Sequence, residues 1–312
     1  MPFKRVPQKF NASIKEVVIG TGGKAVTLGG ENVLPFYGFD APIKNPPRVG
    51  IEVSDLGPDK NVPGIAAFYK DAKSIADVVK RACEMPGASF VYLSLDSADP
   101  NGQNKSIEDC VALCKEVAAV ATLPLVIQGS KNTEKDGQLF VKIAEALDGK
   151  NILLVSAKED NYKSIAVGAV QAYNQKICAE SAVDINLAKQ LNVLISQLGI
   201  KNESVVMHTG TATAGYGFEY VSSSLDRIKA AALSQNDAML QMPILTPVGD
   251  AWSVKESIVS EEDFPDWGPV EERGIAMEIT TATAALASGS NAVILRHPVS
   301  VATISKLVAA LN

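Results

Sequence analysis

Polar residues that could take part in binding or catalysis follow short apolar runs at intervals along this 312-residue chain. The clearest example is the run 205–207, which ends at His208-Thr209-Gly210 and passes into small residues. Its valines favour a buried strand, because β-branched side chains pack well on a pleated sheet. The chain has two histidines, and His297 also follows an apolar run. Functional and structural roles are both open for these histidines.

The polar residues that follow the other runs form a candidate binding set. Few charges are expected to point inward, because the set consists largely of small hydroxyl and amide side chains. It has no lysine suited to a Schiff base, no three-histidine metal set and no evident carboxylate pair. Such a set suits a large, neutral, amide-rich ligand better than catalysis, so we predict no catalytic residue and no metal ligand. Solvated strand ends without a function are the alternative. The set comprises Asp55, Asp96, Gln128, Ser130, Ser156, Glu180, Ser181, Thr246 and Arg296.

The elements that position these residues repeat in a strand–helix pattern. Apolar runs of strand length alternate with segments whose apolar residues recur at the helical period, so the strands are expected to pair in parallel with right-handed crossovers. Runs without polar alternation indicate a sheet covered on both faces. We therefore predict an α/β fold, a (β/α)8 TIM barrel over residues 48–312, with an open doubly wound sheet as the alternative. The predicted strands are 49–53, 90–95, 125–127, 152–155, 177–179, 205–207, 243–245 and 292–295.

Helix-capping residues support the predicted boundaries of the helices. Ser106 and Asp184 occupy helix N-cap positions, where a side-chain oxygen can accept a backbone N–H. Glycines lie just beyond several helical segments, where a left-handed C-cap is expected. These glycines are Gly87, Gly149, Gly199 and Gly289.

Residues 1–47 are predicted to form a separate β-hairpin extension. Two short strand-like segments, 15–19 and 24–28, flank Gly20-Thr21-Gly22-Gly23, which is a hairpin signal. No helix follows this turn, so a phosphate-binding loop is not favoured. Asn45-Pro46-Pro47 marks the passage into the barrel.

Composition limits the classes of partner and cofactor. The chain is 46% hydrophobic and 21% charged with a net charge of -6, which disfavours a nucleic-acid partner. No apolar run reaches the ~18 residues of a membrane span, and the start lacks a signal-peptide core, so we expect a cytoplasmic protein with no membrane partner. Cys110 and Cys114 belong to the apolar stripe of one helix, and no cysteine spacing is typical of an iron–sulfur cluster.

A long loop, 246–269, follows the seventh predicted strand. It holds Trp252, Phe264, Trp267 and the acidic run Glu261-Glu262-Asp263. Aromatic residues on a long loop at the functional end of a barrel indicate a lid or a partner interface. A loop that folds back on its own barrel is an equally good interpretation.

The first part of the chain resembles a known family. Gly29-Gly30-Glu31, Leu34-Pro35-Phe36, Pro46-Pro47 and the stretch from Gly50 to Asp55 are similar to the opening of the small, delta-type subunit of the corrinoid/iron–sulfur protein. The hairpin and the repeated pattern extend the resemblance over the whole chain. It implies a TIM-barrel subunit of a heterodimer in the acetyl-CoA synthase/CO dehydrogenase (Wood–Ljungdahl) pathway.

The resemblance also implies a role in methyl transfer. In that family cobalamin lies between this barrel and the large subunit, takes a methyl group from methyltetrahydrofolate through a methyltransferase, and passes it to acetyl-CoA synthase. The iron–sulfur cluster belongs to the large subunit. Val206 and Leu295 stand where the Asp of an Asp-x-His-x-x-Gly cobalamin motif would be, so this chain is not expected to hold the corrin alone. The expected lining residues are His208, Thr209, Gly210, Gln128, Ser156, Glu180, Thr246 and Arg296.

An enzyme is the alternative function. Pterin-dependent methyltransferase barrels resemble this architecture and bind the pterin through acidic and Asn residues at strand ends. Asp96 and Asp99-Pro100-Asn101 form the one comparable cluster. Gln128 and Ser156 stand where Asp or Asn would be wanted, so a non-catalytic subunit is favoured over the methyltransferase.

Overall fold

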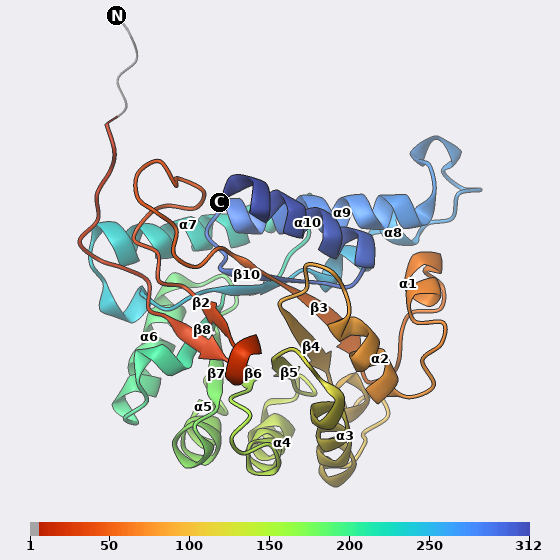
Figure 1. Cartoon of the computed structure of the whole chain (residues 1–312), viewed down its shortest axis with the longest axis horizontal. Coiled ribbons are helices and arrows are strands. Elements are labelled where there is room, and N and C mark those ends of the chain that lie inside the picture. The colour runs from red at the N-terminus through yellow and green to blue at the C-terminus, as the bar shows by residue number, and fades with distance from the viewer. Residues whose placement is uncertain (1–5) are drawn as a thin grey trace, which may run out of the picture.

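The computed structural model describes residues 6–312 and shows a parallel eight-stranded sheet that curls around a central axis (Figure 1). The strand order is β8-β7-β6-β5-β4-β3-β10-β9. A single bridge between Met207 and Ile244 and a 2.8 Å bond from the Met207 N–H to the Pro243 carbonyl close the ring. The predicted (β/α)8 barrel is confirmed. Its strands are β3 (Arg48–Ser54), β4 (Phe90–Ser94), β5 (Leu125–Gln128), β6 (Leu153–Ala157), β7 (Lys176–Glu180), β8 (Val205–His208), β9 (Leu245–Pro247) and β10 (Ala292–Leu295).

Helices surround this sheet (Figure 1), and their apolar sides pack on its outer face. Ser106 and Asp184 cap helices as predicted, and the four predicted C-cap glycines all have positive φ. Cys110 and Cys114 are fully buried in the apolar core. The helices are α1 (Pro63–Phe68), α2 (Ile75–Cys83), α3 (Ile107–Val120), α4 (Thr133–Ala146), α5 (Tyr162–Ile165), which continues as the π-helix Ala166–Gln171, α6 (Ile185–Gln197), α7 (Phe218–Ser234), α8 (Lys255–Ile258), α9 (Val270–Ala287) and α10 (Pro298–Leu311).

Strand alternation divides side chains between the outer face and the lumen. On β3, Val49, Ile51 and Val53 face the helices. The intervening Gly50 and Glu52 pair with Phe90 and Tyr92 of β4, which belong to the lumen core. This alternation decides which strand residues can reach a ligand in the barrel.

The N-terminal hairpin closes the amino end of the barrel. Antiparallel β1 (Val17–Ile19) and β2 (Val26–Leu28) add their buried side chains to the lumen core, beside residues such as Phe90. The Asn151 amide, just before β6, donates to the Val18 and Gly20 carbonyls at 2.8 and 2.9 Å. The hairpin therefore shares a core with the strands, and the division at residue 47 stays a prediction.

The seventh strand differs from its prediction. We expected 243–245, whereas β9 spans Leu245–Pro247. Pro243 has no N–H to donate to a ladder, and it contributes only its carbonyl to Met207. The pairing with β10 therefore begins at Leu245.

Among the described residues, no helix is both long and apolar enough to cross a membrane.

Candidate functional site

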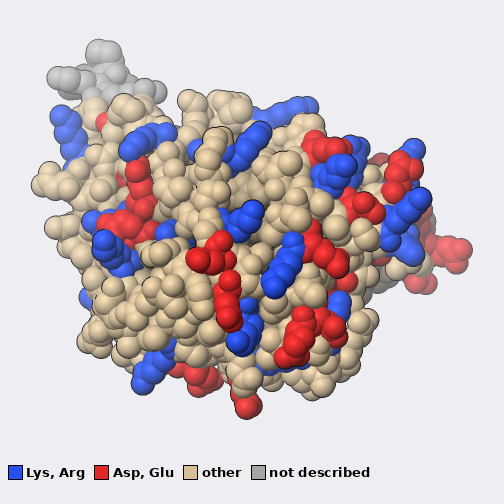
Figure 2. Space-filling model, turned by 60° about the horizontal axis from the view of Figure 1, so that its bottom comes forward, with Lys and Arg blue, Asp and Glu red and all other residues tan. Residues whose placement is uncertain are grey.

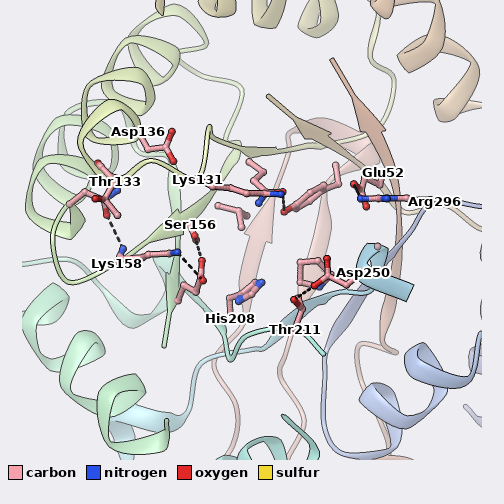
Figure 3. Close-up of a pocket in the computed structure, with 17 residues that line it drawn as sticks. Glu52, Lys131, Thr133, Asp136, Ser156, Lys158, His208, Thr211, Asp250 and Arg296 are labelled. Atoms are coloured by element: carbon pink, nitrogen blue, oxygen red, sulfur yellow. Dashed lines mark hydrogen bonds and ion pairs between the residues drawn. The ribbon is translucent and has the colours of Figure 1, made fainter. Parts of the chain in front are cut away.

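A cavity of about 250 Å³ opens at the carboxyl ends of the strands (Figure 3). This is the end where TIM-barrel proteins place their functional residues. The cavity is lined by the last residues of β5, β7, β8 and β9 and by Arg296, the residue after β10. Five of the predicted lining residues meet here, and they are Gln128, Ser156, Glu180, His208 and Arg296.

The other predicted lining residues lie behind the cavity wall. The Thr246 side chain faces away from the lumen, where its hydroxyl lies 2.8 Å from that of Ser290. Thr209 is buried, and its hydroxyl has no hydrogen-bond partner among the described residues. Gly210 does not line the cavity itself, but its backbone N–H donates to Nδ1 of the lining residue His208 at 3.1 Å. Strand alternation explains this division, since Thr246 and Thr209 each neighbour a lumen-facing residue.

The expectation of few inward-facing charges is wrong. Glu52, Asp136 and Asp250 also line the cavity, together with Lys131 and Lys158 (Figure 3). Glu52 lies inside a strand that we treated as apolar throughout, and its position between two outward-facing residues was the available signal. The two lysines come from loops, whose course over the mouth could not be inferred from periodicity. Charges of both signs are also interspersed on the surface shown in Figure 2.

Glu52 and Arg296 form an ion pair at one side of the cavity. Arg296 Nη2 lies 3.0 Å from Glu52 Oε1. Burial would lower the pKa of Arg296, but the charge of Glu52 outweighs it and raises that pKa. A Cβ atom at Gly249 would lie 2.6 Å from Glu52 Oε2 and 2.8 Å from Arg296 Nε. Gly249 is therefore required for space, because a larger residue would displace the pair.

A hydrogen-bond network fixes the Gln128 amide. The Tyr92 hydroxyl donates to Gln128 Oε1 at 2.7 Å, and the Ser94 hydroxyl lies 3.4 Å from the same atom. Ser54 and Ser94 hydroxyls donate to Asp96 at 2.6 and 2.8 Å. With its oxygen engaged, Gln128 has its NH₂ group left as a donor for a ligand.

Glu180 and His208 form the opposite side. Glu180 accepts from the Ser156 hydroxyl and lies 3.2 Å from Lys158 Nζ. Burial alone would raise the pKa of Glu180, but His208, Ser156 and Lys158 together lower it. Burial lowers the pKa of His208, against the opposing effect of Glu180, and favours a neutral ring. Because His208 Nδ1 accepts from Gly210, the neutral ring carries its proton on Nε2 and can donate to a ligand.

A buried carboxyl supports Arg296 from behind. Glu278 of α9 accepts the Arg296 backbone N–H at 2.6 Å and the His297 N–H at 3.3 Å. Burial raises the pKa of Glu278 to about 7. The second histidine does not line the cavity, since His297 Nε2 lies 3.1 Å from Glu271 Oε1 and its ring stacks on Trp252. These contacts favour a structural role for His297.

The two tryptophans of the long loop have different environments. Trp252 packs back on the barrel, against Gly274 of α9, where a Cβ atom would overlap its ring. Trp267 is 40% exposed, and its ring lies beside Phe264 with Lys255 Nζ near both rings. The segment around α8 projects from the body beside α9 (Figure 1). The first part of the loop thus folds back, and the second part presents an aromatic surface.

Comparison with known proteins identifies the family of this chain. The family model described as CO dehydrogenase/acetyl-CoA synthase delta subunit matches residues 16–290. The chain belongs to this family. The acetyl-CoA decarbonylase/synthase complex subunit delta of Archaeoglobus fulgidus is 32% identical over 98% of this chain and 70% of its own length. The corresponding subunit of Methanocaldococcus jannaschii is 30% identical over 96% of this chain and 74% of its own length. The predicted resemblance is confirmed.

Solved structures place this delta-family chain among known TIM barrels. Dihydropteroate synthase from Thermus thermophilus, in complex with 4-aminobenzoate, matches with a TM-score of 0.57 and 11% identity over 95% of this chain and all (100%) of that one. A Xanthomonas albilineans dihydropteroate synthase matches with a TM-score of 0.56 and 13% identity over 95% and 98% of the two chains. At such identities the likeness establishes the fold alone.

Within residues 6–312, no cluster of three or more His, Cys, Asp or Glu side chains has the arrangement of a metal site.

Proposed function

We propose that this delta-family barrel caps a corrinoid that is held mainly by a larger partner subunit. The observation that carries the proposal is the family match over residues 16–290, combined with a ligand-sized opening at the functional end of the barrel. The corrinoid would supply a cobalt centre that accepts and donates a methyl group. The corrin ring is too large to fit inside a cavity of about 250 Å³, so the ring would lie across the mouth.

The rim of the mouth fits a flat ring with amide substituents. Large apolar side chains are exposed in loops or first helical turns that follow strands, and they would exclude water from a ring above them. Lys131, Lys158 and the His208 Nε2 proton would donate to amide carbonyls. The exposed apolar residues are Leu56, Val183, Tyr216, Tyr220, Ile258, Trp267 and Val299.

This role requires partners. The proposed ones are the corrinoid/iron–sulfur large subunit as heterodimer partner, a methyltetrahydrofolate methyltransferase and acetyl-CoA synthase. No catalytic group of this chain is needed, because the methyl group is transferred by the partners. Of the predicted lining residues, Gln128, Ser156, Glu180, His208 and Arg296 have side chains at the mouth and are the ones we retain as cofactor contacts.

A second candidate function is binding of methyltetrahydrofolate by this barrel itself. The charged cavity favours it, because Glu52, Glu180 and Arg296 supply the groups that a pterin's N–H and carbonyl edge would need. A Yersinia pestis dihydropteroate synthase of the same fold is described with a pterine–sulfa conjugate. The chemistry of the mouth thus supports two ligands of different size.

Spectroscopy after gel filtration tests the capping role. The chain alone and the chain with its large subunit are incubated with cobalamin, and the corrin absorbance in each protein fraction is recorded. We expect retention by the pair and none by this chain alone. Retention by this chain alone would reveal an independent corrin site, and retention by neither would contradict the proposal.

A pair of exposed variants makes the test specific. Tyr220 lies in the first turn of α7, the helix that follows β8, and is 67% exposed, whereas Val167 lies on the π-helix after α5 and is 47% exposed. Tyr220→Asp should reduce corrin retention by the pair, and Val167→Asp should leave it unchanged. Equal retention by both variants would argue against a cap at the mouth.

A further inference from the structure

A second cavity adjoins the first. It has a volume of about 240 Å³ and lies under the loop that follows β3, against α1 and α2. Glu52 and Arg296 line both cavities. Their ion pair therefore forms the boundary between the two spaces.

The two cavities differ in chemistry. The first is lined by charged groups of both signs, with Lys131, Lys158 and Arg296 opposed by a similar number of carboxylates. Such balance suits a polar, neutral ligand group better than a phosphate. The second cavity is more apolar, and its wall includes Leu56, Ile65, Tyr69 and Val78.

Tyr69 supplies a polar group in this apolar wall. Its side chain is buried, with 5% of the residue exposed, and its hydroxyl has no hydrogen-bond partner among the described residues. A buried hydroxyl without a partner carries a free-energy cost that a ligand acceptor would relieve.

Arg296 makes the boundary suitable for an aromatic group. Its side chain is 39% exposed while that of Glu52 is 9% exposed, so the pair holds the guanidinium in place and leaves part of it accessible. A fixed planar guanidinium stacks well on an aromatic ring.

We propose that the two cavities form one bipartite site for a reduced pterin that carries an aryl arm. The pterin occupies the charged cavity, the aryl ring crosses Arg296, and the arm enters the second cavity, where its amide accepts from the Tyr69 hydroxyl. This inference rests on the second candidate function. It adds a subsite that would distinguish folate-type pterins from simple pterins.

Calorimetry with two probes tests the inference on the full chain. Methyltetrahydrofolate has the aryl arm, and 6-methyltetrahydropterin lacks it. We expect the arm to increase affinity roughly tenfold, as stacking on a fixed guanidinium would. Tyr69→Phe, which keeps the ring and removes the hydroxyl, should weaken methyltetrahydrofolate binding several-fold and leave 6-methyltetrahydropterin unchanged.

A matched pair of bulky substitutions locates the subsite. Leu56→Trp narrows the second cavity at a position that is 57% exposed, and Val167→Trp adds the same kind of bulk at a 47% exposed position outside both cavities. Only Leu56→Trp should reduce the affinity for methyltetrahydrofolate to that for the short pterin. Because both positions are exposed, loss of folding is not expected.

The outcomes separate the inference from the function on which it depends. Equal affinity for the two probes, unaffected by Leu56→Trp, would overturn the second subsite and leave the pterin site standing. Binding of neither probe would overturn both. Neither result bears on the corrin retention of the pair.

Discussion

The two ends of the barrel lumen are built from the same strands and have opposite chemistry. At the amino end, Val17 and Leu28 of the hairpin pack with Phe90 in an apolar plug. At the carboxyl end, the lumen holds Glu52 and Arg296 around a cavity. In TIM barrels generally, residues at the amino end contribute to stability and residues at the carboxyl end carry the function, and the two ends of this lumen differ in the same sense.

Buried carboxyls at the two ends differ in the same way. At the closed end Glu31 Oε1 lies 2.6 Å from Lys229 Nζ and 2.7 Å from the Asn291 amide. Burial would raise the pKa of Glu31, but Lys229 and Asn291 lower it, so Glu31 stays ionised. Glu278 near the open end accepts the backbone N–H groups of Arg296 and His297 instead, and burial raises its pKa to about 7. The closed end thus gains stability as pH rises through the acidic range, and the open end loses it.

Truncating the plug should have the largest effect. Leu28 is 1% exposed in the lumen core, so Leu28→Ala should lower the free energy of unfolding by about 2–5 kcal/mol, through lost burial and a cavity. Val18, on the paired strand, is 40% exposed, and Val18→Ala should change it by less than about 0.5 kcal/mol. Urea unfolding measures both, and similar values would mean that the hairpin contributes little to the core.

Removing the charge of Glu278 should change the pH dependence of stability. The folded pKa of about 7 exceeds the ordinary value of 4.5, so the native state binds the proton more tightly and stability falls as pH rises between these values. Between pH 5 and pH 8 this fall amounts to about 2–3 kcal/mol. Glu278→Gln should remove that part of the dependence, as followed by urea midpoints at the two pH values. An unchanged dependence in the variant would show that Glu278 is ionised throughout.

Histidine titration gives the smallest and most local effect. The chain's two histidines allow NMR titration of each ring, and both pKa values should be lowered from 6.5 by burial. Glu180 opposes the shift at His208, and Glu271 opposes it at His297. Glu180→Gln should therefore lower the pKa of His208 further without changing that of His297, and Glu271→Gln should do the reverse. A shift of both histidines in either variant would contradict the separation of the two environments.

Much of the fold could be predicted because its signals are local. Apolar runs such as 205–207 and 292–295 coincide with strands, and caps such as Ser106 act within one turn. The candidate site was predicted less completely. His208 and Arg296 were found because they end strands, whereas Glu52 was missed inside a strand and Lys158 in a loop.

The sequence by itself determined the barrel, its family and the end at which to look for function, because periodicity, caps and motif residues act over short distances along the chain. Only the tertiary structure decided which strand-end residues face the cavity and which lie behind it. Thr246 and Glu52 show the reason. A side chain's face depends on the register of its strand, and register is set by pairing with neighbours distant in sequence. The ion pair between Glu52 and Arg296 likewise depends on the pairing of β3 with β10, the first and last strands of the barrel.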